Sequence, residues 1–151
     1  MRDDELVEAL AAKLRAYATA PLADLEVHEW PQVGYEDADG SVTVAVEDGS
    51  QEHIALGDTA QSLEDAITLS VTGIVPHADT QAVRRDLVLL REQILDVLRQ
   101  NRTLTAGGED ATTNAREKIT WTYGLAAEGE KMLRACMVSV TYRKTPDEAT
   151  A

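Results

Sequence analysis

The chain has 151 residues, a formal net charge of −13 and a single cysteine, so it cannot form an internal disulfide bond. A chain of this length is expected to fold as a single domain, residues 1–151, with one hydrophobic core. It contains no run of about 18 apolar residues, so no transmembrane helix is predicted. Its acidic, then amphipathic start differs from a signal peptide, so we expect a protein made and kept in a cytoplasm.

The negative charge is confined to the first half of the sequence. Residues 1–76 contain 16 acidic and 3 basic residues, whereas residues 77–151 contain 11 of each. An acidic surface repels DNA phosphates, which argues against a protein that reads nucleic-acid sequence, although it could line a passage through which DNA slides. The acidic composition resembles that of proteins from high-salt environments, where salt screens charge repulsion. An acidic protein from an ordinary high-GC organism is the alternative.

The first part of the chain predicts one helix followed by short strands. Apolar side chains recur every three or four positions over residues 3–18, which predicts a helix capped by Asp3 or Asp4. The buried stripe of this helix is Leu6, Leu10, Leu14 and Tyr17. Alternating apolar and polar positions then predict strands over residues 25–29, 41–48 and 51–57. The Asp48-Gly49 pair is a strong signal for a tight turn between the last two.

A long strand and a long helix form the centre of the predicted fold. Apolar residues fall on odd positions between 63 and 75, and Pro76 ends this strand because proline has no N–H for the ladder. Over residues 80–100 the period changes to that of one helical stripe. This stripe is Val83, Leu87, Leu90, Ile94 and Leu98. We expect the helix to fold back across the apolar face of the strand.

Two further strands complete the predicted domain. Residues 101–110 are predicted as a loop in which Gly107 and Gly108 adopt backbone angles that other residues avoid. Strands over residues 115–126 and 131–144 are joined by a hairpin, and residues 145–151 form a loose polar tail. The predicted order is α-β-β-β-β-α-β-β. It describes an α+β domain whose mostly antiparallel sheet packs against an N-terminal helix and one long helix.

No motif in the sequence points to catalysis or to a metal. The three histidines lie in separate segments, and none has a second ligand at metal-binding spacing. They are His28, His53 and His77. Cys136 falls on the apolar face of a strand, which is typical of a buried structural thiol, and residues 37–40 fit a turn better than a calcium loop. We therefore predict no enzyme activity, no metal and no cofactor.

The charged face of the long helix is a candidate subunit interface. Arg84, Arg85 and Arg91 lie on it, interleaved with acidic residues. One interpretation is a solvated face with local ion pairs. The other is an interface in which these arginines meet the acidic first half of a neighbouring copy, and the separation of charge favours it. The long closing strands support assembly as well, because exposed strand edges pair with other chains.

The whole arrangement resembles the tail terminator (tail completion) proteins of long-tailed bacterial and archaeal viruses. The resemblance covers about residues 6–142 and is carried by the order of elements. These are the amphipathic opening helix, the early strands and the strand 63–75 that runs into the helix 80–100. The turn Leu104-Thr-Ala-Gly-Gly108 follows, and the closing hairpin ends with Val138-Ser-Val-Thr-Tyr142.

The resemblance implies a structural virion protein of the tail and neck, assembled in the host cytoplasm. Such proteins form a ring, typically a hexamer, that caps the tail tube, ends its elongation and offers a docking surface to the neck of the filled head. The implied partners are further copies of the chain, the tail tube protein and a head-closure or neck protein. Viral DNA would pass through the ring without sequence-specific binding, and no membrane would be involved.

Exposed loops and hairpin ends are the candidate contacts with tube or neck. They are Glu36, Asp37, Asp39, Leu104, Gly107, Gly108, Glu109, Asp110, Glu128, Gly129, Glu130 and Lys131. Three alternatives stay open: another neck or connector ring protein, a cellular α+β enzyme or small-ligand binder, and a regulatory module with a heteromeric partner. A pocket with convergent polar groups would favour the enzyme or small-ligand binder. A defined partner without self-assembly would favour the regulatory module.

Overall fold

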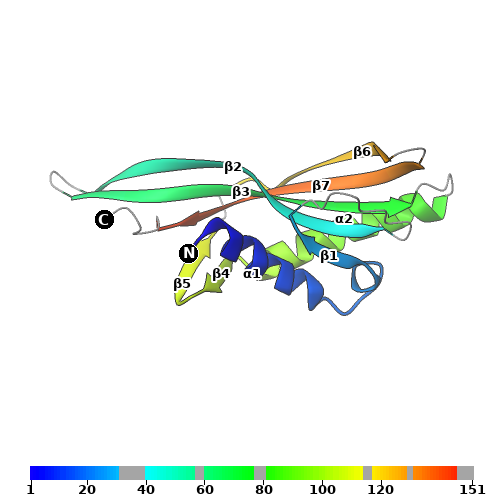
Figure 1. The fold of residues 1–151 in the computed structure, drawn as a ribbon, viewed down its shortest axis with the longest axis horizontal. Coiled ribbons are helices and arrows are strands. Elements are labelled where there is room, and N and C mark those ends of the chain that lie inside the picture. Colours follow the sequence, from blue (N-terminus) through cyan, green and yellow to red (C-terminus); the bar gives the residue numbers. More distant parts are fainter. Residues whose placement is uncertain (31–39, 57–59, 77–80, 114–116, 129–130, 146–151) are drawn as a thin grey trace.

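The computed structural model describes residues 1–30, 40–56, 60–76, 81–113, 117–128 and 131–145. It shows an α+β fold in which helices α1 (Asp3–Arg15) and α2 (Gln81–Gln100) lie under one face of a curled, mixed and mostly antiparallel sheet of seven strands (Figure 1). The predicted fold class is confirmed, with the element order α-β-β-β-α-β-β-β-β. In the described part of the chain, no helix is both long and apolar enough to cross a membrane.

The sheet is built around three long strands. Strand β2 (Ser41–Leu56) pairs with β3 (Ala60–Pro76), and β3 pairs with β7 (Lys131–Lys144), both antiparallel. The short β1 (Glu26–Glu29) adds to β2 in parallel, after the 3-10 turn η1 (Leu22–Asp24). On its other side, β7 pairs with β6 (Thr120–Glu128) at one end and with β5 (Glu109–Thr112) at the other, and β4 (Thr103–Ala106) follows β5.

Helix α2 packs tightly against the sheet at Gly73 of β3. A Cβ atom at this position would lie 2.6 Å from Leu90 Cδ2 and 3.1 Å from Cys136 Sγ, so a side chain there would force a neighbour to shift. The apolar stripe of α2 covers β3 and β7 here, as the periodicity predicts. Side chains from all three elements are fully buried in this core, among them Leu69, Val71, Leu90, Ile94, Val138 and Tyr142.

Helix α1 adds a second part to the same core. The predicted stripe of Leu6, Leu10 and Leu14 is fully buried. Arg2, rather than Asp3 or Asp4, is the residue that precedes the first turn, and both aspartates lie within that turn, where the helix dipole favours them. Tyr17 lies beyond the end of the helix, and its hydroxyl donates to Asp96 of α2 across 3.3 Å.

The predicted tight turn at Asp48-Gly49 is wrong. Strand β2 continues through these residues and pairs with β3 along its length, with a register shift between Val46 and Asp48. The carboxylate of Asp48 accepts a hydrogen bond from the Gly49 N–H at 2.8 Å. Asp48 and Gly49 stay extended because pairing with the 17-residue β3 outweighs the local turn signal.

The predicted loop over residues 101–110 is also wrong in part, because β4 and β5 form a hairpin there. Gly107 and Gly108 make its two-residue turn with φ values of +60° and +79°, which confirms their predicted backbone angles. Leu104, predicted as an exposed contact residue, is fully buried in the core. Its alternation with exposed neighbours is that of a strand with one face covered.

The close packing at Gly73 predicts that adding one methyl group at this position destabilises the protein. We expect Gly73→Ala to lower the free energy of unfolding by about 1–3 kcal/mol, because α2 or Cys136 must shift to make room. Gly124→Ala is the matched control, since a Cβ at that strand position meets nothing within 4 Å. Urea denaturation of both variants checks this, and equal stability of the two would contradict the packing described.

Candidate functional site

Two exposed aromatic side chains of β6 lie beside α2. Trp121 is 44% and Tyr123 47% exposed, although their cross-strand partners Val138 and Cys136 are buried. The guanidinium of Arg91 lies over both rings, 4.7 Å from the centroid of Trp121 and 6.0 Å from that of Tyr123. Val88, 45% exposed, lies one turn before Arg91 on α2. We call Val88, Arg91, Trp121 and Tyr123 the Trp121 patch.

The charge of this patch is held close to the sheet. The side chain of Arg91 is only 13% exposed and pairs with Glu92, while its Nε has no hydrogen-bond partner in the described part of the protein. Cation–π contacts of this kind are worth about 0.5–2 kcal/mol, depending on desolvation. The patch thus combines exposed apolar area with a cation and a hydrogen-bond donor that still lacks an acceptor.

The strand that carries the two aromatic residues has a free edge. All nine residues of β6 pair with β7, and no described strand pairs with its other side. Its sequence is Thr-Trp-Thr-Tyr-Gly-Leu-Ala-Ala-Glu, with no proline and no charge before Glu128, and its register with β7 is regular. Proline, charges and bulges are the features that normally prevent edge strands from pairing with other chains. This edge lacks them over most of its length.

A second free edge belongs to the β2–β3 hairpin, which extends beyond the helices (Figure 1). Strand β1 covers β2 only at residues 41–44, so residues 45–56 have no described neighbour on that side. The sequence contains 13 acidic residues and neither lysine nor arginine between Arg15 and Arg84. We call residues 45–56 and 60–65 the acidic arm.

The two free edges lie at opposite ends of the sheet. The hairpin end of β6 and β7 is at one end of the long axis, and the acidic arm is at the other (Figure 1). Arg84 and Arg85 are exposed on α2, whose N-terminal half lies toward the β6–β7 end. The sheet therefore separates charge along its length, and the sequence shows this only as a difference between its two halves.

The predicted tube and neck contacts do not form one surface. Gly107, Gly108, Glu109 and Asp110 are exposed at the β4–β5 hairpin, far from the β6–β7 hairpin end where Glu128 faces Lys131 (Figure 1). The remaining predicted contacts lie outside the described residues: Glu36, Asp37, Asp39, Gly129 and Glu130.

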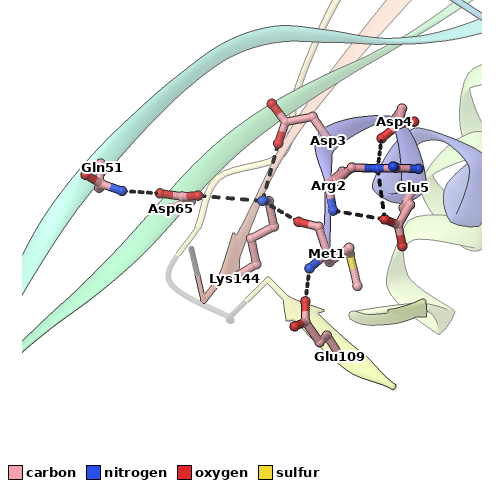
Figure 2. A network of polar contacts seen from close by, with 9 residues as sticks. All are labelled: Met1, Arg2, Asp3, Asp4, Glu5, Gln51, Asp65, Glu109 and Lys144. Atoms are coloured by element: carbon pink, nitrogen blue, oxygen red, sulfur yellow. Dashed lines mark hydrogen bonds and ion pairs between the residues drawn. The ribbon is translucent and has the colours of Figure 1, made fainter. Parts of the chain in front are cut away.

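A dense cluster of charges surrounds Lys144, a buried residue near the end of β7 (Figure 2). Its ammonium donates to the Met1 carbonyl at 2.7 Å and lies 3.4 Å from Asp3 and 3.6 Å from Asp65. The amino group of Met1 pairs with Glu109, and Gln51 donates to Asp65. The Met1 carbonyl accepts a hydrogen bond from the ammonium and the two carboxylates form ion pairs with it, so this cluster ties α1 to β3 and β7.

The described residues hold little else that suggests chemistry. Burial raises the pKa of the Cys136 thiol to about 11, which keeps it protonated and weakly nucleophilic near neutral pH. The described part of the chain contains no group of three or more histidine, cysteine or acidic side chains placed to hold a metal ion. Of the histidines, His28 lies half-buried in β1, and His77 falls outside the described residues.

Comparison with models of known protein families finds no match, and comparison with curated proteins finds none either. The function of the chain must therefore be argued from its own surfaces. Of these, the two free strand edges and the Trp121 patch are the most distinctive.

The Lys144 cluster predicts a stability effect that an exposed lysine does not have. We expect Lys144→Met to lower the free energy of unfolding by about 1–3 kcal/mol, because the hydrogen bond of a charged group to the Met1 carbonyl and the ion pairs with Asp3 and Asp65 are lost. Lys118→Met, at an exposed position, should change it by less than about 0.5 kcal/mol. Urea denaturation of both variants tests this, and indistinguishable midpoints would show that the cluster does not hold α1 on the sheet.

Proposed function

We propose that this chain is a structural virion protein, a tail terminator whose copies form a hexameric ring that caps the tail tube. The observation that carries the proposal is a pair of strand edges, at opposite ends of one sheet, that no other described strand covers. Two different surfaces that bind each other associate head to tail, and such contacts generate rings when the rotation closes. The exposed aromatic residues beside one edge support an interface, since such patches mark association sites.

The function proposed for this ring needs no bond-making chemistry. The ring would end tail elongation by occupying the last face of the tube, and its other face would receive the neck of the filled head. The partners would be the tail tube protein and a head-closure or neck protein, within the virion. The protonated, buried thiol of Cys136 agrees with a structural role.

The acidic composition supports the passage of DNA through such a ring. Phosphates are repelled by an acidic surface, so a lumen with excess negative charge would let DNA slide without being held. The first half of the chain carries the entire net charge of −13.

Another ring protein of the head–tail neck is the second candidate, because free strand edges favour self-assembly of either kind. The long helix α2 between β3 and β4 fits a tail terminator better than the β-barrels or helical bundles expected of connector components. Binding to purified tail tubes, rather than to filled heads, would separate the two candidates.

The first test is the mass of the purified protein by light scattering at low and at molar salt, with negative-stain images of the same samples. We expect hexameric rings with a central hole. A strict monomer in both salts that also fails to bind tail tubes would contradict the proposed function.

The exposed arginines of α2 predict a charge effect on assembly. We expect Arg84→Glu/Arg85→Glu to weaken each contact of the ring about two- to thirtyfold, since two surface pairs together contribute about 0.4–2 kcal/mol and about 1.4 kcal/mol is tenfold. Arg91 is left unchanged because it contacts Trp121 within the same copy, so its reversal would change more than the charge of the interface. Sedimentation velocity over a dilution series measures the effect.

Arg99→Glu is the control, since Arg99 is exposed at the far end of the same helix. Circular dichroism should be unchanged in both variants. Equal assembly of the double variant and the control would remove α2 from the interface.

A further inference from the structure

We propose that the free edge of β6 in one copy pairs antiparallel with the free edge of β2 in the acidic arm of the next copy, beside the Trp121 patch. The occupant of the β6 edge is thus a second copy of this chain. This inference rests on the proposed function, because it names the contact that would build the proposed ring.

The strand directions agree with this pairing. Strands β2, β3, β7 and β6 are each antiparallel to the next, so β2 and β6 run in opposite directions within one copy. When a second copy continues the sheet in the same orientation, its β2 lies antiparallel to the β6 of the first. An antiparallel pair of edges can exchange backbone hydrogen bonds directly, without a change in either strand.

The register sets the stagger between the copies. Gly124, at the middle of β6, pairs with Ala135 of β7, which pairs with Ile74 of β3, which in turn pairs with Ser41 of β2. Gly124 and Ser41 therefore lie level across the sheet. The middle of the free β2 edge lies near Ser50, so neighbouring copies are offset along the strands by roughly 30 Å, at about 3.3 Å per residue. A closed ring accommodates such an offset when its strands are inclined to the ring axis, as in β-barrels.

The charges favour the arm as the occupant. The acidic arm contains Glu47, Asp48, Glu52, Glu64 and Asp65 and neither lysine nor arginine. Glu64 and Asp65 pair with Arg143 and Lys144 of the same copy, so the remaining acids supply the charge offered to a neighbour. The β6 edge lies beside Arg91, whose Nε lacks an acceptor among the described residues, and α2 also presents Arg84 and Arg85. Carboxylates of the arm can pair with the exposed Arg84 and Arg85, and opposite charges on the two surfaces select this partner.

A symmetric pair of two β6 strands is the competing arrangement. It would bring the arginines of two copies together, which like-charge repulsion disfavours. It would also close after two copies and leave both acidic arms unpaired. The asymmetric contact uses both free edges and repeats from copy to copy.

The experiment uses one variant on each side of the contact. Trp121→Lys places a charge on the β6 edge, and Asp48→Lys/Ser50→Lys reverses the charge of the arm. Met137→Lys is the control, because Met137 is 38% exposed but lies on the opposite face of the sheet, in a strand with neighbours on both sides. Each variant is checked for its circular dichroism and melting temperature, then analysed by light scattering.

We expect each of the two edge variants alone to be monomeric and Met137→Lys to assemble like the unchanged protein. A 1:1 mixture of the two edge variants should give a heterodimer and nothing larger, because it retains one intact β6 edge and one intact arm. An arm variant that still dimerises alone would overturn the inference in favour of symmetric β6 pairing.

The outcomes separate this inference from the proposed function. Rings that persist in both edge variants overturn the inference and leave the proposed function standing. If the mixture forms heterodimers but the unchanged protein forms open chains instead of rings, the strand pairing is supported and the proposed ring function is contradicted. Absence of any association, in the unchanged protein and in the mixture, overturns the strand pairing.

Discussion

The packing of α2 across β3 and β7 is the contact on which the rest of the structure depends. Leu90 and Cys136 both lie close to Gly73, so a side chain at position 73 would force one of them to shift. Helix α2 starts at the β6–β7 end of the sheet and runs toward its middle, so the β2–β3 hairpin extends past the helices at the other end (Figure 1). The acidic arm is therefore a consequence of how the core is covered, and its separation from the β6 edge follows from the length of the strands.

The long, regular patterns of the sequence predicted this core well. The helical stripe of residues 80–100 and the alternation in residues 63–75 and 131–144 appear as α2, β3 and β7. The prediction from a local turn signal failed at Asp48-Gly49, where pairing with the long strand β3 holds the backbone extended. The β4–β5 hairpin was missed because its strands have four residues each, too few to establish an alternation.

The candidate site was predictable only in part. The exposure of Arg84 and Arg85 follows from helical periodicity, whereas Arg91, predicted on the same charged face, is only 13% exposed and lies over Trp121. Trp121 and Tyr123 share the face of β6 that the alternation predicts to be apolar, yet both are exposed because β6 is an edge strand. Alternation along one strand carries no information about its neighbours. The same holds for Lys144, whose burial depends on α1 and β3, elements distant from it in sequence.

The way charge is distributed over the surface affects assembly differently from the total net charge. A net charge of −13 spread evenly would make copies repel one another, whereas acids in the arm and arginines on α2 give each copy two surfaces of opposite sign. At molar salt the Debye length falls to about 3 Å, which weakens both the repulsion and the attraction between exposed groups. Backbone hydrogen bonds and the burial of Trp121 and Tyr123 would then hold two copies together. Charge would select the arm as the partner, and strand pairing would supply most of the affinity in a high-salt environment.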